Sequence, residues 1–482
     1  MGTNHGQMQS DLSRQAPTWV MKPVRLGAGL VIGALTLATL AVALWVAWQE
    51  RQKTNIPKPP ADQHQPINPP GQAAKNIAII DAKQKEQLLP RKDAPGQAAQ
   101  NIGIIDADGY ARYGFRIAEG RGLVDDQGRP TAFRGPTYPL VCAGLALVFG
   151  PRLEVVQTAQ CVFYALANGL IGLLAYRYGA GLRVVVLTML GVMFFWPAWP
   201  WFCHIFTEPL FTLLLALILW SWLEMVRQPR WWKHLLTGLW LAVGALCRPE
   251  VYVLVPIPLL DTLRQHGWKI WRAWGGVAWL LVGFALLEVP WVVRNWLSVG
   301  RAILTADAGM ENFFLATWYQ EANWQGNPLH DPKRFPPAGQ GFWQLPLEER
   351  NRIFRELAWQ NIREAPGQVL LCMPKRLLMF FFQYPPRGWL PTWKSLLLGV
   401  PLYGLAVVGY LVAPETLKIL LRRALAILAV LALVHTLLVS EFRYSAPVQP
   451  YVLLMASTAF WRLVNLALGR QWAGDGIAGG TR

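Results

Sequence analysis

Charged residues are scarce in this chain. Asp, Glu, Lys and Arg make up 15% of its 482 residues, whereas 53% are hydrophobic and 25 are Trp. This is far more apolar sequence than the cores of one or two water-soluble domains require. The scarcity of charge therefore excludes an ordinary soluble protein and indicates a polytopic membrane protein.

The apolar sequence also lacks the alternation of polar and apolar residues that is typical of β-barrel strands. It forms solid runs instead, many of about the 20 residues that a helix needs to cross hydrocarbon. Because backbone groups in lipid must be hydrogen-bonded within the segment, these runs are predicted to be helices. The predicted fold class is all-α, with about ten to twelve transmembrane helices. The clearest runs are 26–48, 155–176, 184–203, 209–223, 274–293, 396–413, 425–440 and 446–461.

Two shorter apolar pieces, 235–247 and 251–260, have basic flanks and favour a tight hairpin with Arg248, Pro249 and Glu250 at its tip. Residues 134–150 either span the membrane or dip back, and the sequence leaves both open.

Cysteine is rare as well. The five Cys residues lack metal-ligand spacing and mostly lie within apolar runs, where a thiol behaves as a small hydrophobic group. This excludes a disulfide framework and a zinc site. An acidic cluster with ligand spacing is also missing, so we predict no required cofactor and no metal ligands and leave a divalent cation open.

The formal charge of +17 comes from Lys and Arg that collect in short segments beside apolar runs, as Lys22 and Arg25 do. This pattern marks cytoplasmic loops, so the predicted partner of the positive charge is the lipid bilayer and not nucleic acid. It predicts a multi-pass protein of the plasma (inner) membrane, with the first helix running from inside to outside.

The expected organisation follows from this orientation. An exterior or periplasmic loop over 49–135 contains the near-identical segments PGQAAKNIAIIDA at 70–82 and PGQAAQNIGIIDA at 95–107, which indicate a local duplication. A second exterior segment includes the apolar run 368–384, which is predicted to lie on the membrane surface because Lys375 and Arg376 interrupt it. The predicted regions are a cytoplasmic tail (1–24), a first helix (25–48), the first loop (49–135), a transmembrane core (136–296), the second exterior segment (297–392), C-terminal helices (393–466) and a cytoplasmic tail (467–482).

Ionisable residues in or beside the apolar runs concentrate at the predicted exterior ends of the helices. Such residues are costly in a membrane and mark functional sites. By the predicted orientation they face the same side as Asp106, as Glu441 does. The candidate substrate-binding residues are Tyr110, Glu208, Arg248, Glu250, Arg294, Asn295, Lys375, His435 and Arg443.

Several of these candidates also have a structural explanation. The arginines can extend to lipid headgroups, Glu208 can cap a helix N-terminus, and a lone His435 can bond a backbone carbonyl in a neighbouring helix. The sequence does not choose between these explanations and a binding role.

Several motifs occur in an order that resembles the GT-C glycosyltransferases of the dolichyl-phosphate-mannose-protein mannosyltransferase type. The resemblance covers about residues 100–465, and each block alone is loose. The blocks are DADGYARYGFRIAEGRG with PTAFRGPTYPLVCAGLALVFG, then TEPLF, ALCRPE, VPWVVRNWLSVGRAILTADAGMENFF, IREAPGQVLLCMPKRLLMFF and HTLLVSEFRYSAPVQPY.

The resemblance implies an inverting transfer of sugar from a polyprenyl-phosphate-linked donor. The acceptor is a hydroxyl of a cell-envelope glycan, lipid or protein on the outer face. Asp106 is the implied catalytic base because Tyr110 follows it at the family's spacing, and Asp108 is its rival. The paired Asp-Glu of many members is absent, since Gly109 follows Asp108.

Positive groups must stabilise the departing phosphate. Arg294 is the first candidate for this role, followed by Arg443 or Lys375, with Glu208 and His435 orienting acceptor or phosphate. A secondary transporter or flippase is the alternative function, although the inverted repeats typical of that class are not found in the sequence.

Overall fold

The structure is a computed structural model, and it describes residues 21–54, 109–195, 204–266, 271–318, 335, 342, 345–383 and 391–469. Asp106, Asp108 and both copies of the duplicated segment lie outside these residues. Within the described ranges every regular element is a helix, and pairing between extended residues is limited to one isolated bridge, Val124 to Pro130. The predicted all-α fold class is confirmed.

Most of the helices are joined by short connections, and the longest intervals lie between α2 and α5 and between α14 and α15. In order the helices are α2 (Leu26–Thr54), α5 (Thr137–Phe149), α6 (Leu153–Arg177), α7 (Leu182–Met193), α9 (Glu208–Arg227), α10 (Trp231–Cys247), α11 (Val251–Leu254), α12 (Pro256–His266), α13 (Trp271–Val299), α14 (Gly309–Thr317), α15 (Leu347–Glu364), α16 (Pro366–Phe381), α17 (Trp393–Val412), α18 (Glu415–Leu437), the 3-10 helix η5 (Phe442–Val448) and α19 (Gln449–Ala467).

Five of these helices are long and apolar enough to cross a membrane, which confirms a multi-pass membrane protein. α5 and α7 are apolar but shorter. At about 1.5 Å per residue, the 13 residues of α5 reach about 20 Å, less than the thickness of the hydrocarbon. The orientation, the region boundaries and the full number of spans stay predictions. The five long segments are Leu26–Gln49, Leu153–Arg177, Glu208–Arg227, Ala273–Val299 and Trp393–Val412.

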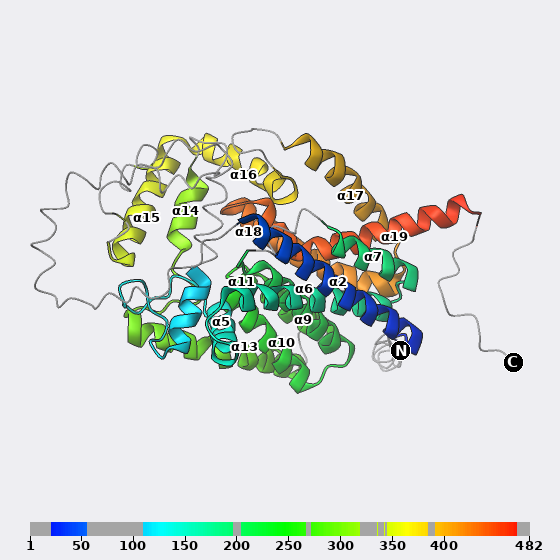
Figure 1. Cartoon of the computed structure of the whole chain (residues 1–482), viewed down its shortest axis with the longest axis horizontal. Coiled ribbons are helices and arrows are strands. Elements are labelled where there is room, and N and C mark those ends of the chain that lie inside the picture. The colour runs from blue at the N-terminus through cyan, green and yellow to red at the C-terminus, as the bar shows by residue number, and fades with distance from the viewer. Residues whose placement is uncertain are drawn as a thin grey trace, which may run out of the picture.

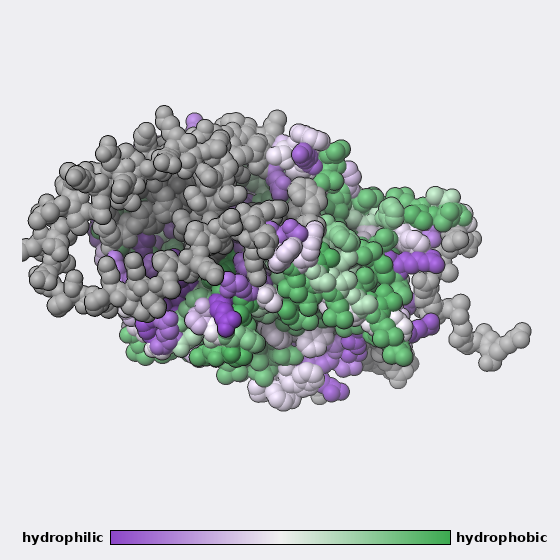
Figure 2. Space-filling view, viewed as in Figure 1, coloured by the Kyte–Doolittle hydropathy of each residue, from purple (hydrophilic) through white to green (hydrophobic). Residues whose placement is uncertain are grey.

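The outer faces of the long helices are apolar. Figure 2 shows hydrophobic residues covering much of the visible helical body. Large side chains such as Leu37 and Trp45 on α2, and Leu397 and Leu411 on α17, are more than half exposed. A continuous apolar surface of this kind is unfavourable in water and is what lipid chains contact.

Close helix pairs use glycine where the backbones meet. A Cβ atom at Gly238 of α10 would collide with the backbone of Leu280 in α13, and one at Gly283 of α13 would collide with Leu235. Small residues let helix backbones approach closely, so the glycines allow α10 and α13 to pack in direct contact. α13 is thereby held against α10, which leads directly to Arg248.

The two polar segments meet at one end of the molecule, where the helix over 109–118, α14 and α15 gather (left in Figure 1). The Asp307 amide donates to the Ala132 carbonyl at 2.8 Å, and Asn351 Nδ2 donates to Asp307 Oδ1 at 2.8 Å. The second polar segment therefore contacts the first directly, through the hydrogen bond between Asp307 and Ala132.

Arg248, Pro249 and Glu250 form the connection between α10 and α11, and the tight hairpin of the two apolar pieces stays a prediction. The position of α16 on the membrane surface stays a prediction, but Arg376, one of the two cations on which it rests, is 2% exposed and lies inside the protein. There its guanidinium donates to carbonyls at the end of α18, including those of Thr436 and Leu438.

Candidate functional site

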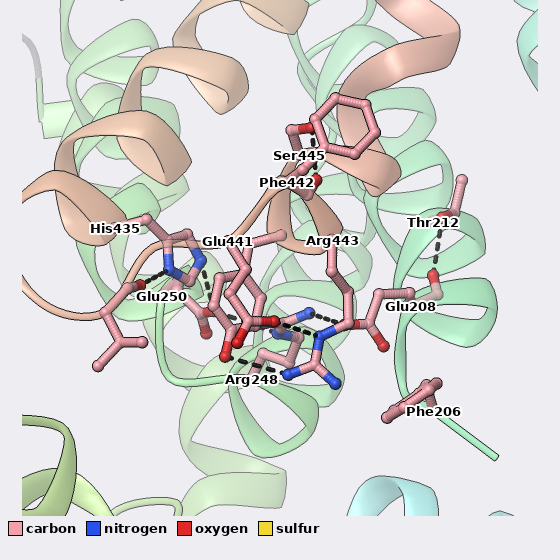
Figure 3. Close-up of polar contacts among 12 residues, drawn as sticks. Phe206, Glu208, Thr212, Arg248, Glu250, His435, Glu441, Phe442, Arg443 and Ser445 are labelled. Atoms are coloured by element: carbon pink, nitrogen blue, oxygen red, sulfur yellow. Dashed lines mark hydrogen bonds and ion pairs between the residues drawn. The ribbon is translucent and has the colours of Figure 1, made fainter. Parts of the chain in front are cut away.

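Five of the predicted residues lie in one cluster built by four separate segments (Figure 3). Glu208 is the first residue of α9, and Arg248 and Glu250 form the tip between α10 and α11. His435 lies in the last turn of α18, and Arg443 lies in η5. Glu208, Glu250 and Arg248 are 2%, 6% and 9% exposed, so folding removes their charges from solvent.

Arg248 joins two carboxylates at the centre of the cluster. Its Nη1 lies 3.4 Å from Glu208 Oε1, and its Nε lies 3.1 Å from Glu250 Oε1. His435 Nε2 lies 3.1 Å from the same Glu250 oxygen, and His435 Nδ1 lies 2.8 Å from the carbonyl of Val439. His435 thus contacts a carbonyl, as one explanation expected, but in its own chain segment and together with a carboxylate.

Arg443 forms looser ion pairs at the edge of the cluster. Its Nε lies 3.4 Å from Glu208 Oε1 and 3.5 Å from Glu441 Oε2, and the Glu441 side chain is 42% exposed. Glu208 thus contacts both Arg248 and Arg443, so its role is not limited to the first turn of α9. At these distances the contacts are weak hydrogen bonds at best, and the pairing is chiefly electrostatic.

Aromatic rings enclose the charges. The ring of Tyr444 stacks on His435 at 4.3 Å between centroids and 7° between planes. The guanidinium carbons of Arg248 and Arg443 lie 5.1 and 5.0 Å from the centre of the same ring. Arg443 also lies 4.8 Å from the ring of Phe206. Cations in contact with ring faces are stabilised by the ring quadrupole, so the aromatic residues help to hold both guanidinium groups in place.

The cluster keeps Glu250 ionised. Burial alone raises the pKa of a carboxyl group, but the Arg248 charge and the contact with His435 outweigh it and lower the pKa of Glu250 to about 2. With three carboxylates (Glu208, Glu250, Glu441) and two guanidinium groups, the net charge is −1 when His435 is neutral. Glu250 Oε2 is buried and has no hydrogen bond to any residue that the structure describes.

A chain of contacts links Tyr110 to this cluster. Its ring meets Tyr138 edge-on at 5.3 Å, and Tyr138 is hydrogen-bonded to Gln160 Oε1. That oxygen also accepts from the amide of Phe206 at 2.9 Å, and Phe206 contacts Arg443. The helix over 109–118, which carries Tyr110, begins directly after Asp108.

Arg294 and Asn295 are placed differently. Arg294 donates to the carbonyls of Thr131 and Leu123, both at 2.8 Å, and to Asn295 Oδ1 at 3.0 Å. Asn295, which is fully buried, donates to the Ile303 carbonyl at 2.8 Å. The pair fastens the two polar segments to the end of α13.

Lys375 is partly exposed on α16. Its neighbour Arg376, which was not selected from the sequence, supports the cluster through the end of α18, just beyond His435. Tyr444 was also not selected, although its position directly after Arg443 was the available signal. Asp106 and Asp108 lie outside the described residues. Within the described residues, no group of three or more His, Cys, Asp or Glu side chains is arranged to hold a metal ion.

Comparison with known proteins yields structural matches only. No family model and no curated protein matches the chain. Two crystal structures of ArnT from Cupriavidus metallidurans match it. The structure bound to undecaprenyl phosphate is 15% identical, with 80% of each chain covered and a TM-score of 0.34. The apo structure is 14% identical, with 82% of this chain and 80% of that chain covered and a TM-score of 0.34. A TM-score of this size carries no argument about family or function.

Proposed function

We propose that the chain is a membrane glycosyltransferase. It transfers a sugar from a polyprenyl-phosphate-linked donor to a hydroxyl of a cell-envelope acceptor on the outer face of the plasma membrane. The convergence of Glu208, Arg248, Glu250, His435 and Arg443 carries this proposal. These residues were selected from the sequence as a candidate binding set, and they come from distant segments. Buried charges at the end of membrane helices are costly and mark functional sites.

The short stretch of chain between the proposed base and Tyr110 is compatible with the proposal. Asp106 precedes Tyr110 by four residues, which span at most about 14 Å when fully extended. Tyr110 is in turn linked through Tyr138 and Gln160 to Phe206 beside Arg443. The proposal therefore requires the chain before Tyr110 to bring the carboxylate of Asp106, or of Asp108, to this cluster.

In the proposed reaction Asp106 accepts the proton of the acceptor hydroxyl. The hydroxyl oxygen forms a bond to the anomeric carbon from the face opposite the phosphate. The bond between that carbon and the phosphate oxygen breaks, so the configuration inverts and polyprenyl phosphate leaves with the electron pair. A base within hydrogen-bond reach of the hydroxyl and cations beside the leaving oxygen are what this step requires.

The contacts favour particular residues as ligands of the phosphate and of the sugar hydroxyls. Arg443 is the better phosphate ligand because its ion pairs are long and it lies at the edge of the cluster, whereas the hydrogen bonds of Arg294 go to backbone carbonyls. Glu250 Oε2 is a buried acceptor that a sugar hydroxyl can satisfy.

The test uses the full-length chain in liposomes, with radiolabelled lipid-linked sugars extracted from host membranes as donor and the host envelope fraction as acceptor. The wild-type chain is expected to move label from the lipid to the acceptor, and Asp106→Asn to reduce this at least 100-fold, as general-base catalysis contributes about 10²–10⁴-fold. Asp108→Asn decides between the two acids. The matched control is Asp125→Asn, since Asp125 bonds within its own turn of the same loop.

A different outcome would replace the proposal. Transport of labelled sugar into the liposomes without covalent transfer would identify a transporter. Full transfer by both the Asp106 and the Asp108 variants would exclude these acids as the base. Mass spectrometry of lipid-linked sugars that accumulate in a deletion strain would then name the donor.

A further inference from the structure

A second charged group lies at the opposite end of α9 from the candidate site. The helix has 20 residues and so rises about 30 Å, the thickness of the hydrocarbon core. Glu208 is its first residue, and Glu224 lies in its last turn. Glu224 therefore lies about 24 Å from Glu208 along the helix axis, near the opposite end of the predicted span.

A cavity of about 240 Å³ opens here between the end of α9 and the start of α10. This volume is below the roughly 300–1,000 Å³ of pockets for drug-sized ligands, so the cavity suits one small headgroup. Its apolar walls include two indoles, which are typical of membrane interfaces. The cavity is lined by Trp220, Trp232, Leu236, Glu224, Gln228 and Lys233.

One carboxylate oxygen of Glu224, a residue that lines the cavity, has no hydrogen-bond donor in the described part of the chain. Lys233, 5% exposed, donates to Glu224 Oε2 at 2.9 Å, and Arg227 donates to the same oxygen at 2.7 Å. The other oxygen, Glu224 Oε1, is buried and has no hydrogen bond to any residue in the described part of the chain. A buried anionic oxygen without a donor is costly, so this position calls for a ligand that brings one.

The ligand must also suit the cations. Lys233 has three donors, of which two go to Glu224 and to Gln228 at 3.1 Å. With one carboxylate and two cations, Glu224, Arg227 and Lys233 carry a net charge of +1. A phosphate oxygen beside Lys233 is therefore favourable, together with a donor toward Glu224.

We propose that this cavity binds the headgroup of a phospholipid that carries a primary ammonium group. The ammonium donates to Glu224 Oε1 and packs against the indoles of Trp220 and Trp232, which attract cations. The phosphate lies beside Lys233, and the acyl chains follow the apolar surface beyond Leu236. A choline headgroup lacks the N–H donor, and a glycerol headgroup lacks the positive charge.

The experiment measures lipid binding to the full-length protein in detergent by native mass spectrometry. Phosphatidylethanolamine, phosphatidylcholine and phosphatidylglycerol with identical acyl chains are compared. The ethanolamine lipid is expected to bind about tenfold more tightly than the choline lipid, the ratio that one charge-assisted hydrogen bond supplies. Glu224→Gln is expected to abolish this preference.

Two further variants make the result decisive. Leu236→Trp fills the cavity and is expected to reduce binding of the ethanolamine lipid without removing any charge, so it tests the site even where Glu224→Gln impairs folding. Glu415→Gln is the matched control, because Glu415 pairs with Lys418 and Arg422 on the surface and does not line this cavity.

Equal binding of the ethanolamine and choline lipids would overturn the inference and leave Glu224 Oε1 to a water molecule. Equal binding of the ethanolamine and glycerol lipids would also overturn it, because it would show a general phosphate site. Lipid binding is measured without sugar transfer, so this result is independent of the proposed enzymatic function.

Discussion

The arginines of the charged cluster and Arg294 use the same side chain in different ways. Arg248 and Arg443 contact the carboxylates of Glu208, Glu250 and Glu441. Arg294 donates to backbone carbonyls of the first loop and to a neighbouring amide. From the sequence, Arg294 was the first candidate for the phosphate, yet its contacts are those of an anchor.

The two kinds of contact differ in which group is left without its partner when the arginine is removed. A carbonyl that loses a guanidinium is still neutral and can bond water, whereas a buried carboxylate that loses its cation is an uncompensated charge. The charged cluster therefore depends on each member, and the Arg294 anchor is more tolerant. Three substitutions test this contrast.

Arg248→Met should have the greatest consequence. It leaves Glu208 and Glu250 buried without their shared cation, and we expect the free energy of unfolding to fall by about 3–5 kcal/mol. Thermal or denaturant unfolding of the detergent-solubilised protein measures the change. Arg352→Met, at a side chain that is 61% exposed, is the control and should have little effect. A loss below 1 kcal/mol for Arg248→Met would show that the carboxylates do not depend on this cation.

Arg294→Gln should have an intermediate effect. It removes hydrogen bonds from a half-buried guanidinium to Leu123 and Thr131, and we expect a loss of about 2 kcal/mol with faster proteolysis near these residues. Sugar transfer should persist once the protein is folded. If transfer is abolished while the loop stays protected from protease, Arg294 is the phosphate ligand after all and the contrast between the two groups fails.

Glu441→Gln should have the smallest effect. Its carboxylate is 42% exposed and 3.5 Å from Arg443, so the change in unfolding free energy should stay below about 1 kcal/mol. Because Arg443 is the proposed phosphate ligand, the salt dependence of donor binding is the more sensitive measurement. Unchanged donor affinity together with a large loss of stability would place Glu441 in the structural part of the cluster.

The sequence anticipated much of the helical framework because apolar runs and basic flanks respond to the bilayer alone. It also selected Glu208, Arg248, Glu250, His435 and Arg443, since an ionisable residue beside an apolar run is conspicuous. It did not distinguish Lys375 from Arg376. The two cations are adjacent, and which one points inward depends on how α16 packs against α18.

Tyr444 illustrates the same limit from the apolar side. In the sequence it resembles many aromatic residues at membrane interfaces. Its contact with His435 and two arginines arises only when α18, η5 and the α10–α11 tip meet. Neither hydropathy nor spacing contains that information.

The order of residues alone decided that this chain is helical and membrane-embedded, because hydrocarbon imposes length and hydrogen bonding on each segment separately. Tertiary packing decided which arginine meets a carboxylate and which meets a carbonyl. These choices depend on contacts between segments as far apart as Glu208 and Arg443, whose energies are set by distance and burial and not by neighbours in the chain.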